Sequence, residues 1–328
     1  MAEPTPTRRK VLAAAAGLAA GSVALSGGVH LKRWLDQPRT RTCVLHARYD
    51  ADLVDLFVRG LRETPGALRR ARGGRVVLKP NLVEAAPGRP INTDPRVVAA
   101  LIEAFRHHGA AEVLVAEGPG HHRDTELILE MTGFREYLDL LKAPFVDLNI
   151  DETRAVTLPR DFTGFGSLRL PRTVLDCDLF VSVAKLKTHH WVGATLTLKN
   201  LFGTVPGAVY GWPKNPLHHA GLDQSILDLW MALRPGLGVV DGIVGMQGDG
   251  PILGQPKDAG VLILGENLPA VDATAARIMG IVPERLGYLA VAARLGGTVA
   301  EGRIEQVGEA AVAQPFDLLP DFAHLRAG

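Results

Sequence analysis

Residues 178–207 read DLFVSVAKLKTHHWVGATLTLKNLFGTVPG, and this stretch decides the fold. Its first apolar segment, Leu179–Ala184, is short and uninterrupted, which predicts a buried strand. The strand leads without a turn into a polar run that contains Lys185, Lys187, His189 and His190, and then Lys199 and Asn200. In open α/β sheets, ligands bind outside the carboxyl ends of the strands. The stretch therefore predicts a strand that ends at a binding site.

The chain on both sides of this stretch alternates short β-rich segments with helical periods. Strands are expected at 42–47, 75–78, 112–116, 237–240 and 261–264, and helices at 52–62, 92–105, 125–141, 219–233 and 269–279. Such alternation is typical of a parallel sheet with helices on both faces. We therefore predict a three-layer α/β fold with a mostly parallel sheet.

Two regions depart from this alternation. An irregular middle insertion is expected at 151–175, and the density of Gly, Pro, Trp and Tyr predicts a long ordered loop or lid at Thr204–Pro216. The predicted single domain spans residues 42–295, and residues 296–328 are expected to form a weakly patterned tail.

The composition limits the class of protein. The chain has 328 residues and is 47% hydrophobic, which is enough for one large α/β domain. Its 36 Lys and Arg residues balance 35 Asp and Glu residues, which argues against a general nucleic-acid binder. The two cysteines, Cys43 and Cys177, cannot hold an iron–sulfur cluster within this chain. They are either two buried strand cysteines or a disulfide.

The first thirty residues have the form of a twin-arginine export signal. Arg8 and Arg9 precede the Ala-rich apolar run Val11–Leu25, and Ser22-Val23-Ala24 suits cleavage. The run is shorter than the roughly 20 apolar residues of a membrane-spanning helix. We therefore expect export by the twin-arginine translocation machinery to the periplasm or another extracytoplasmic location. Retention of the segment as an uncleaved membrane anchor is the alternative.

Lysines gather at the ends of the predicted strands, and parallel strands would bring them to one edge of the sheet. Converging cations repel one another unless an anion or carboxylates lie among them. Glycine-rich turns leave backbone N–H groups open to an oxyanion. We therefore expect a carboxylate- or phosphate-bearing small molecule to be bound by Lys79, Asn81, Lys185, Lys199, Asn200, Gly118 and Gly120.

Three residues are candidates for catalysis. Lys187 lies among other cations, which lower the pKa of an amino group and let it act as a base. His189 and Asp241 are candidates for proton transfer. A divalent metal is a further candidate, with ligands from His121, His189, Asp249 and Asp272. The alternative for both histidines is a hydrogen-bonding role, and no HExxH spacing is present.

Four separated motifs resemble the domain-of-unknown-function family 362. They are KPNLV (79–83), VAKLKTHHWVGATLTLKNLFG (183–203), VVDGIVGMQGDGP (239–251) and LGENLPAVDATAARIMG (264–280), and the likeness covers roughly residues 42–280. Membership implies a common site around Lys79, Asn81, Lys185, Lys187, His189, Lys199, Asn200, Asp241 and Asp272. Members of this family often occur beside or fused to ferredoxin-type iron–sulfur modules, which implies an iron–sulfur protein as a partner. The present chain lacks the cysteine cluster of such modules.

The leading hypothesis from the sequence is an exported α/β enzyme that acts on an anionic substrate at a Lys/His/Asp site, with or without a metal. The first alternative is a non-catalytic protein that binds an anionic ligand or docks on an iron–sulfur protein. The second is an accessory protein that handles a metal during export.

Overall fold

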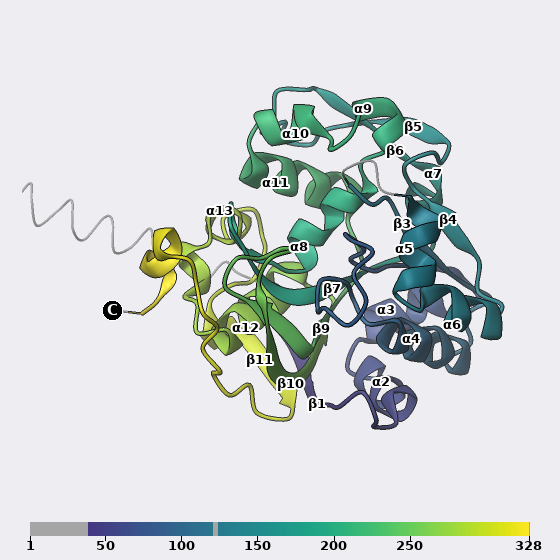
Figure 1. Cartoon of the computed structure of the whole chain (residues 1–328), viewed down its shortest axis with the longest axis horizontal. Coiled ribbons are helices and arrows are strands. Elements are labelled where there is room, and N and C mark those ends of the chain that lie inside the picture. The colour runs from purple at the N-terminus through teal and green to yellow at the C-terminus, as the bar shows by residue number, and fades with distance from the viewer. Residues whose placement is uncertain (1–38, 121–123, 328) are drawn as a thin grey trace, which may run out of the picture. The chain divides into compact units, whose positions relative to one another are not determined.

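A computed structural model of the chain describes residues 39–120 and 124–327 (Figure 1). Within these residues, nine strands form one sheet in the order β11-β1-β10-β9-β7-β2-β3-β4, with β8 paired to β7. Their bounds are β1 Thr40–His46, β2 Arg75–Lys79, β3 Glu112–Glu117, β4 Phe145–Asp147, β7 Leu179–His189, β8 Gly193–Thr195, β9 Leu237–Gln247, β10 Gln255–Gly265 and β11 Ile304–Gly308. β9, β7, β2, β3 and β4 are parallel neighbours. β10 runs antiparallel to β9 and β1.

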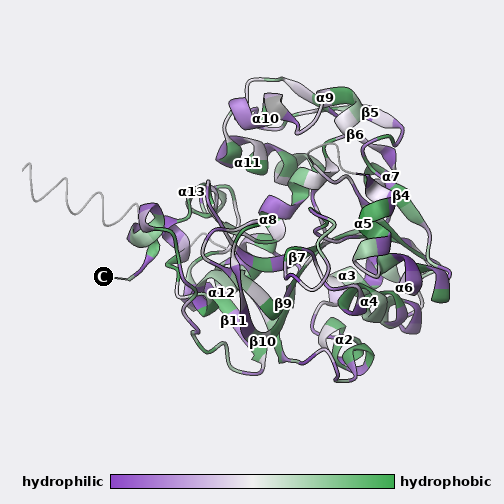
Figure 2. Ribbon diagram, viewed as in Figure 1, coloured by the Kyte–Doolittle hydropathy of each residue, from purple (hydrophilic) through white to green (hydrophobic). Residues whose placement is uncertain are grey.

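Helices cover both faces of the sheet. Alternating residues of β2 divide between the faces: Val76 and Leu78 join one core cluster, and Val77 joins another. The first face is covered by α2 Leu53–Leu61, α3 Pro65–Ala71, α4 Pro95–His107, α5 Thr125–Met131 and α6 Phe134–Leu140. The second is covered by α7 Arg172–Leu175, α8 Thr197–Asn200, α11 Leu222–Leu233, α12 Leu268–Ile278 and α13 Gly287–Ala292. This arrangement confirms the predicted α/β fold, and hydrophobic residues run along the central strands in Figure 2.

The central strand is longer than the sequence predicts. β7 continues past Ala184 to His189, and all of its residues are buried. The extension persists because β8 folds back on it, with Lys187 opposite Thr195, and supplies the backbone partners that an exposed end would lack. Lys185, Lys187 and His189 therefore lie within a strand and not beyond its end. Their spacing of two residues places them on the same side of β7.

The regions outside the regular alternation are also ordered. The expected middle insertion forms a separate antiparallel pair, β5 Thr153–Thr157 and β6 Ser167–Pro171. The loop expected at 204–216 contains the short helix α9 Gly207–Tyr210 and leads into α10 Asn215–His219. The segment expected to be a weakly patterned tail supplies the edge strand β11, which pairs with β1. Phe316 and Leu325 of this segment are buried.

Glycines with positive φ set two helix boundaries. Gly133, with φ 79°, separates α5 from α6, as the predicted interruption requires. The helix expected from His219 begins instead at Leu222, because Gly221 has φ 101° and the preceding residues belong to α10.

Two expectations concern cysteines and membranes. Cys43 and Cys177 are free thiols, so the disulfide alternative is not realised. Among residues 39–120 and 124–327, no helix is long and apolar enough to cross a membrane. The proposed export signal lies outside the described residues.

Candidate functional site

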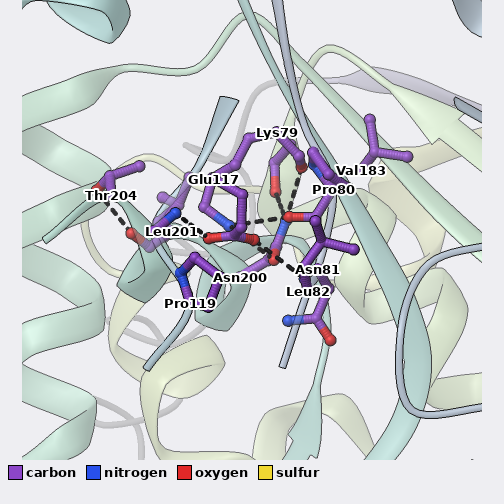
Figure 3. A network of polar contacts seen from close by, with 12 residues as sticks. Lys79, Pro80, Asn81, Leu82, Glu117, Pro119, Val183, Asn200, Leu201 and Thr204 are labelled. Atoms are coloured by element: carbon purple, nitrogen blue, oxygen red, sulfur yellow. Dashed lines mark hydrogen bonds and ion pairs between the residues drawn. The ribbon is translucent and has the colours of Figure 1, made fainter. Parts of the chain in front are cut away.

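A buried ion pair joins the ends of two neighbouring strands. Lys79 ends β2 and Glu117 ends β3, and Lys79 Nζ lies 2.7 Å from Glu117 Oε2. Lys79 Nζ also donates to Asn200 Oδ1 at the end of α8, over 3.1 Å. The remaining oxygen of Glu117, Oε1, accepts from the backbone N–H of Gly118 at 2.8 Å. Figure 3 shows how this network ties the carboxyl edge of the sheet to α8.

A cavity of about 350 Å³ lies against this network. Three further lysines line it from different parts of the chain: Lys187 from β7, Lys199 from α8, and Lys214 from the loop before α10. Among the described residues that line the cavity, Glu117 is the one with an acidic side chain, and it is already paired with Lys79. We call this space the lysine cavity. Its volume lies at the lower end of the range for small-molecule sites.

Burial lowers the pKa of all three lysines. The pKa of Lys214 falls to about 7, with burial as the main cause. The pKa of Lys199 falls to about 8 through burial and then through repulsion by Lys79. The pKa of Lys187 lies well below its ordinary value of 10.5, because burial is reinforced by Lys199 and Lys185. An anion in the cavity would favour the charged forms and reverse these shifts.

The contacts of Lys187 leave one direction of its amino group open. Nζ donates to the carbonyl oxygen of Ile91 at 2.7 Å and lies 3.4 Å from that of Pro251. An amino group that points two N–H bonds at carbonyls keeps one position for the cavity. In the neutral amine that position is a lone pair, and a lone pair can accept a proton.

His189 lines the cavity, and its neutral ring is held in one tautomer. Its Nδ1 accepts the backbone N–H of Trp191 at 3.0 Å, so in the neutral ring the proton sits on Nε2. Burial, and then repulsion from Lys199 and other neighbouring basic groups, hold the pKa of His189 well below 6.5. The neutral ring can therefore donate from Nε2 to an oxyanion but is a poor base at that atom.

Two polar groups on the cavity wall lack a partner within the described structure. They are Asn81 Oδ1 and Thr195 Oγ1, both buried at the atomic level. Asn81 lies beside the Lys79–Glu117 network (Figure 3). A buried polar atom without a hydrogen bond costs about 1–3 kcal/mol, so each is a place where a bound molecule would gain a contact.

Lys185 and Asp241 belong to a different buried network. Lys185 Nζ lies 2.8 Å from Asp241 Oδ2 and donates to the Tyr49 hydroxyl at 2.9 Å. The same Asp241 oxygen accepts the backbone N–H of Asp94. Asp241 does not line the lysine cavity, and Lys185 faces another pocket with Tyr49. The structure therefore separates both residues from Lys187 and His189, although the sequence grouped all four.

The structure does not bring together the candidate metal ligands that lie within residues 39–120 and 124–327. Asp272 is buried against the start of α8, where it accepts N–H bonds from Thr197 and Leu198 at 2.8 and 3.0 Å. Asp249 lies 3.5 Å from His190 instead of from His189. His121 lies outside the described residues. Within the described part of the chain, no group of three His, Cys, Asp or Glu residues is placed to hold a metal.

The glycines expected at the anion site line the cavity. Gly118 is needed for close packing, because a Cβ there would lie 2.7 Å from the carbonyl oxygen of Gly203. Gly120 lines the same space. Lys214 was missed by the sequence reasoning. The signal that could have found it is a lysine within the long ordered loop or lid predicted at Thr204–Pro216, where it has a positive φ of 69°.

Known proteins resemble this chain in sequence or in structure. A thylakoid-associated protein of Synechocystis sp. is 32% identical over 256 residues, which cover 76% of this chain and 77% of that protein. Two solved structures are each 14% identical to the present chain. The lactate racemase apoprotein of Thermoanaerobacterium thermosaccharolyticum has a TM-score of 0.42 over 62% of this chain. A Thermotoga maritima protein has a TM-score of 0.37 over 59%. The present chain spans about half of each solved chain, 51% and 50%.

The family model described as Domain of unknown function (DUF362) matches residues 76–277, a range that contains Lys79, Glu117, Lys187, Lys199 and Lys214. The chain therefore belongs to the DUF362 family.

Proposed function

We propose that this protein is an enzyme that binds a small carboxylate or phosphate in the lysine cavity and moves a proton on it. The observation that carries the proposal is the excess of basic over acidic side chains in one cavity: Lys187, Lys199 and Lys214 share it with a carboxylate that is already paired. Buried cations are normally compensated. An anionic substrate would supply the missing compensation.

The cavity residues divide into two roles. Lys199 and Lys214 have pKa values of about 8 and 7, so near neutral pH they carry the charge that holds an anion. Lys187 has a pKa well below its ordinary value of 10.5 and an open position, and it acts as the base. The Nε2–H group of His189 stabilises the negative charge that develops on the substrate.

The alternative is a non-catalytic protein that captures the same anion. The charged cavity would explain such binding, but the lowered pKa of Lys187 would then have no role. Hydrogen–deuterium exchange distinguishes the two. An enzyme that removes a proton from carbon should exchange C–H for C–D when a suitable carboxylate or phosphate is incubated in D₂O, as read by proton NMR. A binding protein should bind the same compounds without exchange.

Sulfate should bind in the cavity with an affinity that falls as the pH rises. Sulfate stays a dianion throughout, so the change comes from the protein. We expect the strongest binding below pH 7 and a loss as the pH passes about 7 and then about 8, where Lys214 and Lys199 lose their protons. Calorimetry in two buffers of different ionisation enthalpy should show proton uptake on binding, because the anion raises both pKa values.

Matched substitutions locate this binding. Lys214→Met and Lys199→Met should each weaken sulfate about tenfold or more, the worth of one charge-assisted hydrogen bond. Lys257→Met is the control, since Lys257 lies in β10 and does not line the cavity. Equal affinity in all variants, or no binding of sulfate, phosphate or succinate at millimolar concentration, would contradict the proposal.

We also propose that the chain is exported, on the basis of Arg8-Arg9 and the apolar run that follows. The thylakoid association of the Synechocystis relative is consistent with a protein that works at or beyond a membrane. Replacing both arginines by lysine should leave the full-length protein in the cytoplasm, as measured by cell fractionation and by the mature N-terminus. The same double replacement at Arg69-Arg70 in α3 is the control and should not alter the location.

A further inference from the structure

A second, larger space adjoins the lysine cavity. It has a volume of about 560 Å³ and lies between α11, the start of α13 and the C-terminal segment 320–325. α11 and α13 are neighbours in Figure 1. We call it the Trp191 groove. Trp191 and His218 line both the groove and the cavity, so the two spaces meet at these side chains.

Residues of the lysine cavity hold the wall that Trp191 and His218 form between the two spaces. The backbone N–H of Trp191 bonds to His189, and His218 Nδ1 donates to the carbonyl oxygen of Lys214 at 3.2 Å. The Trp191 and His218 rings contact each other edge to face, with centroids 5.6 Å apart. The aromatic wall is therefore built on two residues that belong to the lysine cavity. Trp191 is 61% exposed, which leaves part of it accessible to a ligand.

The groove is suited to an apolar group. Its walls include Val192, Leu222, Leu286 and Phe322. Two of its charged side chains are already engaged by the protein. Arg285 donates to the carbonyl oxygen of His324 at 2.8 Å, and Asp223 accepts a hydrogen bond from the backbone of Tyr288. With these two charges engaged, the aromatic and aliphatic walls are open to an apolar group of a ligand.

We infer that the substrate is an amphipathic anion whose charged head lies in the lysine cavity and whose apolar or aromatic extension lies in the Trp191 groove. This inference rests on the proposed function, because the cavity must hold the head. The cavity alone, at about 350 Å³, takes a small anion, and the groove adds room for an acyl chain or an aromatic ring. Trp191 then covers the junction of head and extension.

A series of n-alkyl phosphates tests the inference with the full-length protein. Methyl, butyl, hexyl and octyl phosphate share one head group and differ only in the length of the chain. Affinity, measured by calorimetry and by tryptophan fluorescence, should rise with chain length by up to about fourfold for each methylene that is buried. Octyltrimethylammonium, with a cationic head, should not bind.

Variants separate the head from the extension. Lys199→Met should weaken every phosphate by the same factor and leave the dependence on chain length unchanged. Phe322→Ala, and Leu222→Ala as a second variant that lines the groove alone, should flatten that dependence while methyl phosphate still binds. Val312→Asp is the control outside both spaces, because Val312 is 59% exposed and lines neither of them.

The outcomes distinguish this inference from the proposed function. If methyl phosphate binds but longer chains bind no better, the groove does not take the extension and the inference fails alone. If the dependence on chain length survives in both groove variants, the inference also fails. If no phosphate binds, the proposed function fails, and the inference with it. Binding of octyltrimethylammonium as tight as that of octyl phosphate would show a general apolar surface and overturn the inference.

Discussion

Replacing Lys79 by methionine is expected to lower the free energy of unfolding by about 3–5 kcal/mol, the cost of leaving one partner of a buried ion pair without the other. Both side chains of the Lys79–Glu117 pair are almost fully buried, at 0% and 2% exposure, so water cannot replace the lost ammonium group. Asn200 Oδ1 would also lose its donor. Chemical denaturation of wild type and variant measures the difference.

Two further variants identify the cause of this loss. Adding Glu117→Gln to Lys79→Met removes the unpaired charge and should restore at least half of the lost stability. Lys199→Met makes the same side-chain change at a lysine for which the described residues provide no ion pair. It should cost less than about 1 kcal/mol, in the range of ordinary substitutions. Equal losses in Lys79→Met and Lys199→Met would show that the ion pair is not what holds the carboxyl edge together.

Lys187→Met should strongly slow proton exchange while leaving the fold intact. Removing the base from a proton-transfer site costs about 10²- to 10⁴-fold in rate. We expect loss of this size in the C–H to C–D exchange of any compound that the wild-type protein exchanges. Methyl phosphate should still bind to the variant, because Lys199 and Lys214 remain.

The pH dependence of the stability of Lys187→Met is an independent test of the lowered pKa of Lys187. The pKa of Lys187 is lower in the folded protein than its ordinary value of 10.5, so between these two values the unfolded chain binds more protons. Wild-type stability should therefore rise as the pH rises toward 10.5, and this contribution should be absent from Lys187→Met. The free energy of unfolding of Lys187→Met, relative to that of wild type, is therefore expected to be highest at low pH and to fall as the pH rises. If the two proteins show parallel pH profiles, Lys187 is not perturbed by burial and is a poor candidate for the base.

The sequence determined the layers of the fold, and it supported the proposal of an anionic ligand. The spacing of apolar residues is a local property of the chain, and it differs between strands and helices. It therefore identified the strands around Val76, Val113 and Val239 and the helices between them. The break at Gly133 followed from backbone conformation at one residue. Lysines after successive strands were enough to predict an anion site, because parallel strands share their carboxyl edge.

The tertiary structure decided which lysines share the site. Lys185 and Lys187 are two residues apart on the same side of β7, yet the first pairs with Asp241 and the second lines the cavity. The register between β7 and β9 shifts between these two residues, so Asp241 lies opposite Lys185 while Lys187 lies opposite Met246. Lys214 reaches the cavity from a distant loop, and Asp272 is used to hold the start of α8. A sequence shows the period of side chains along one segment, but the charge and solvent around a side chain depend on which distant segments pack against it.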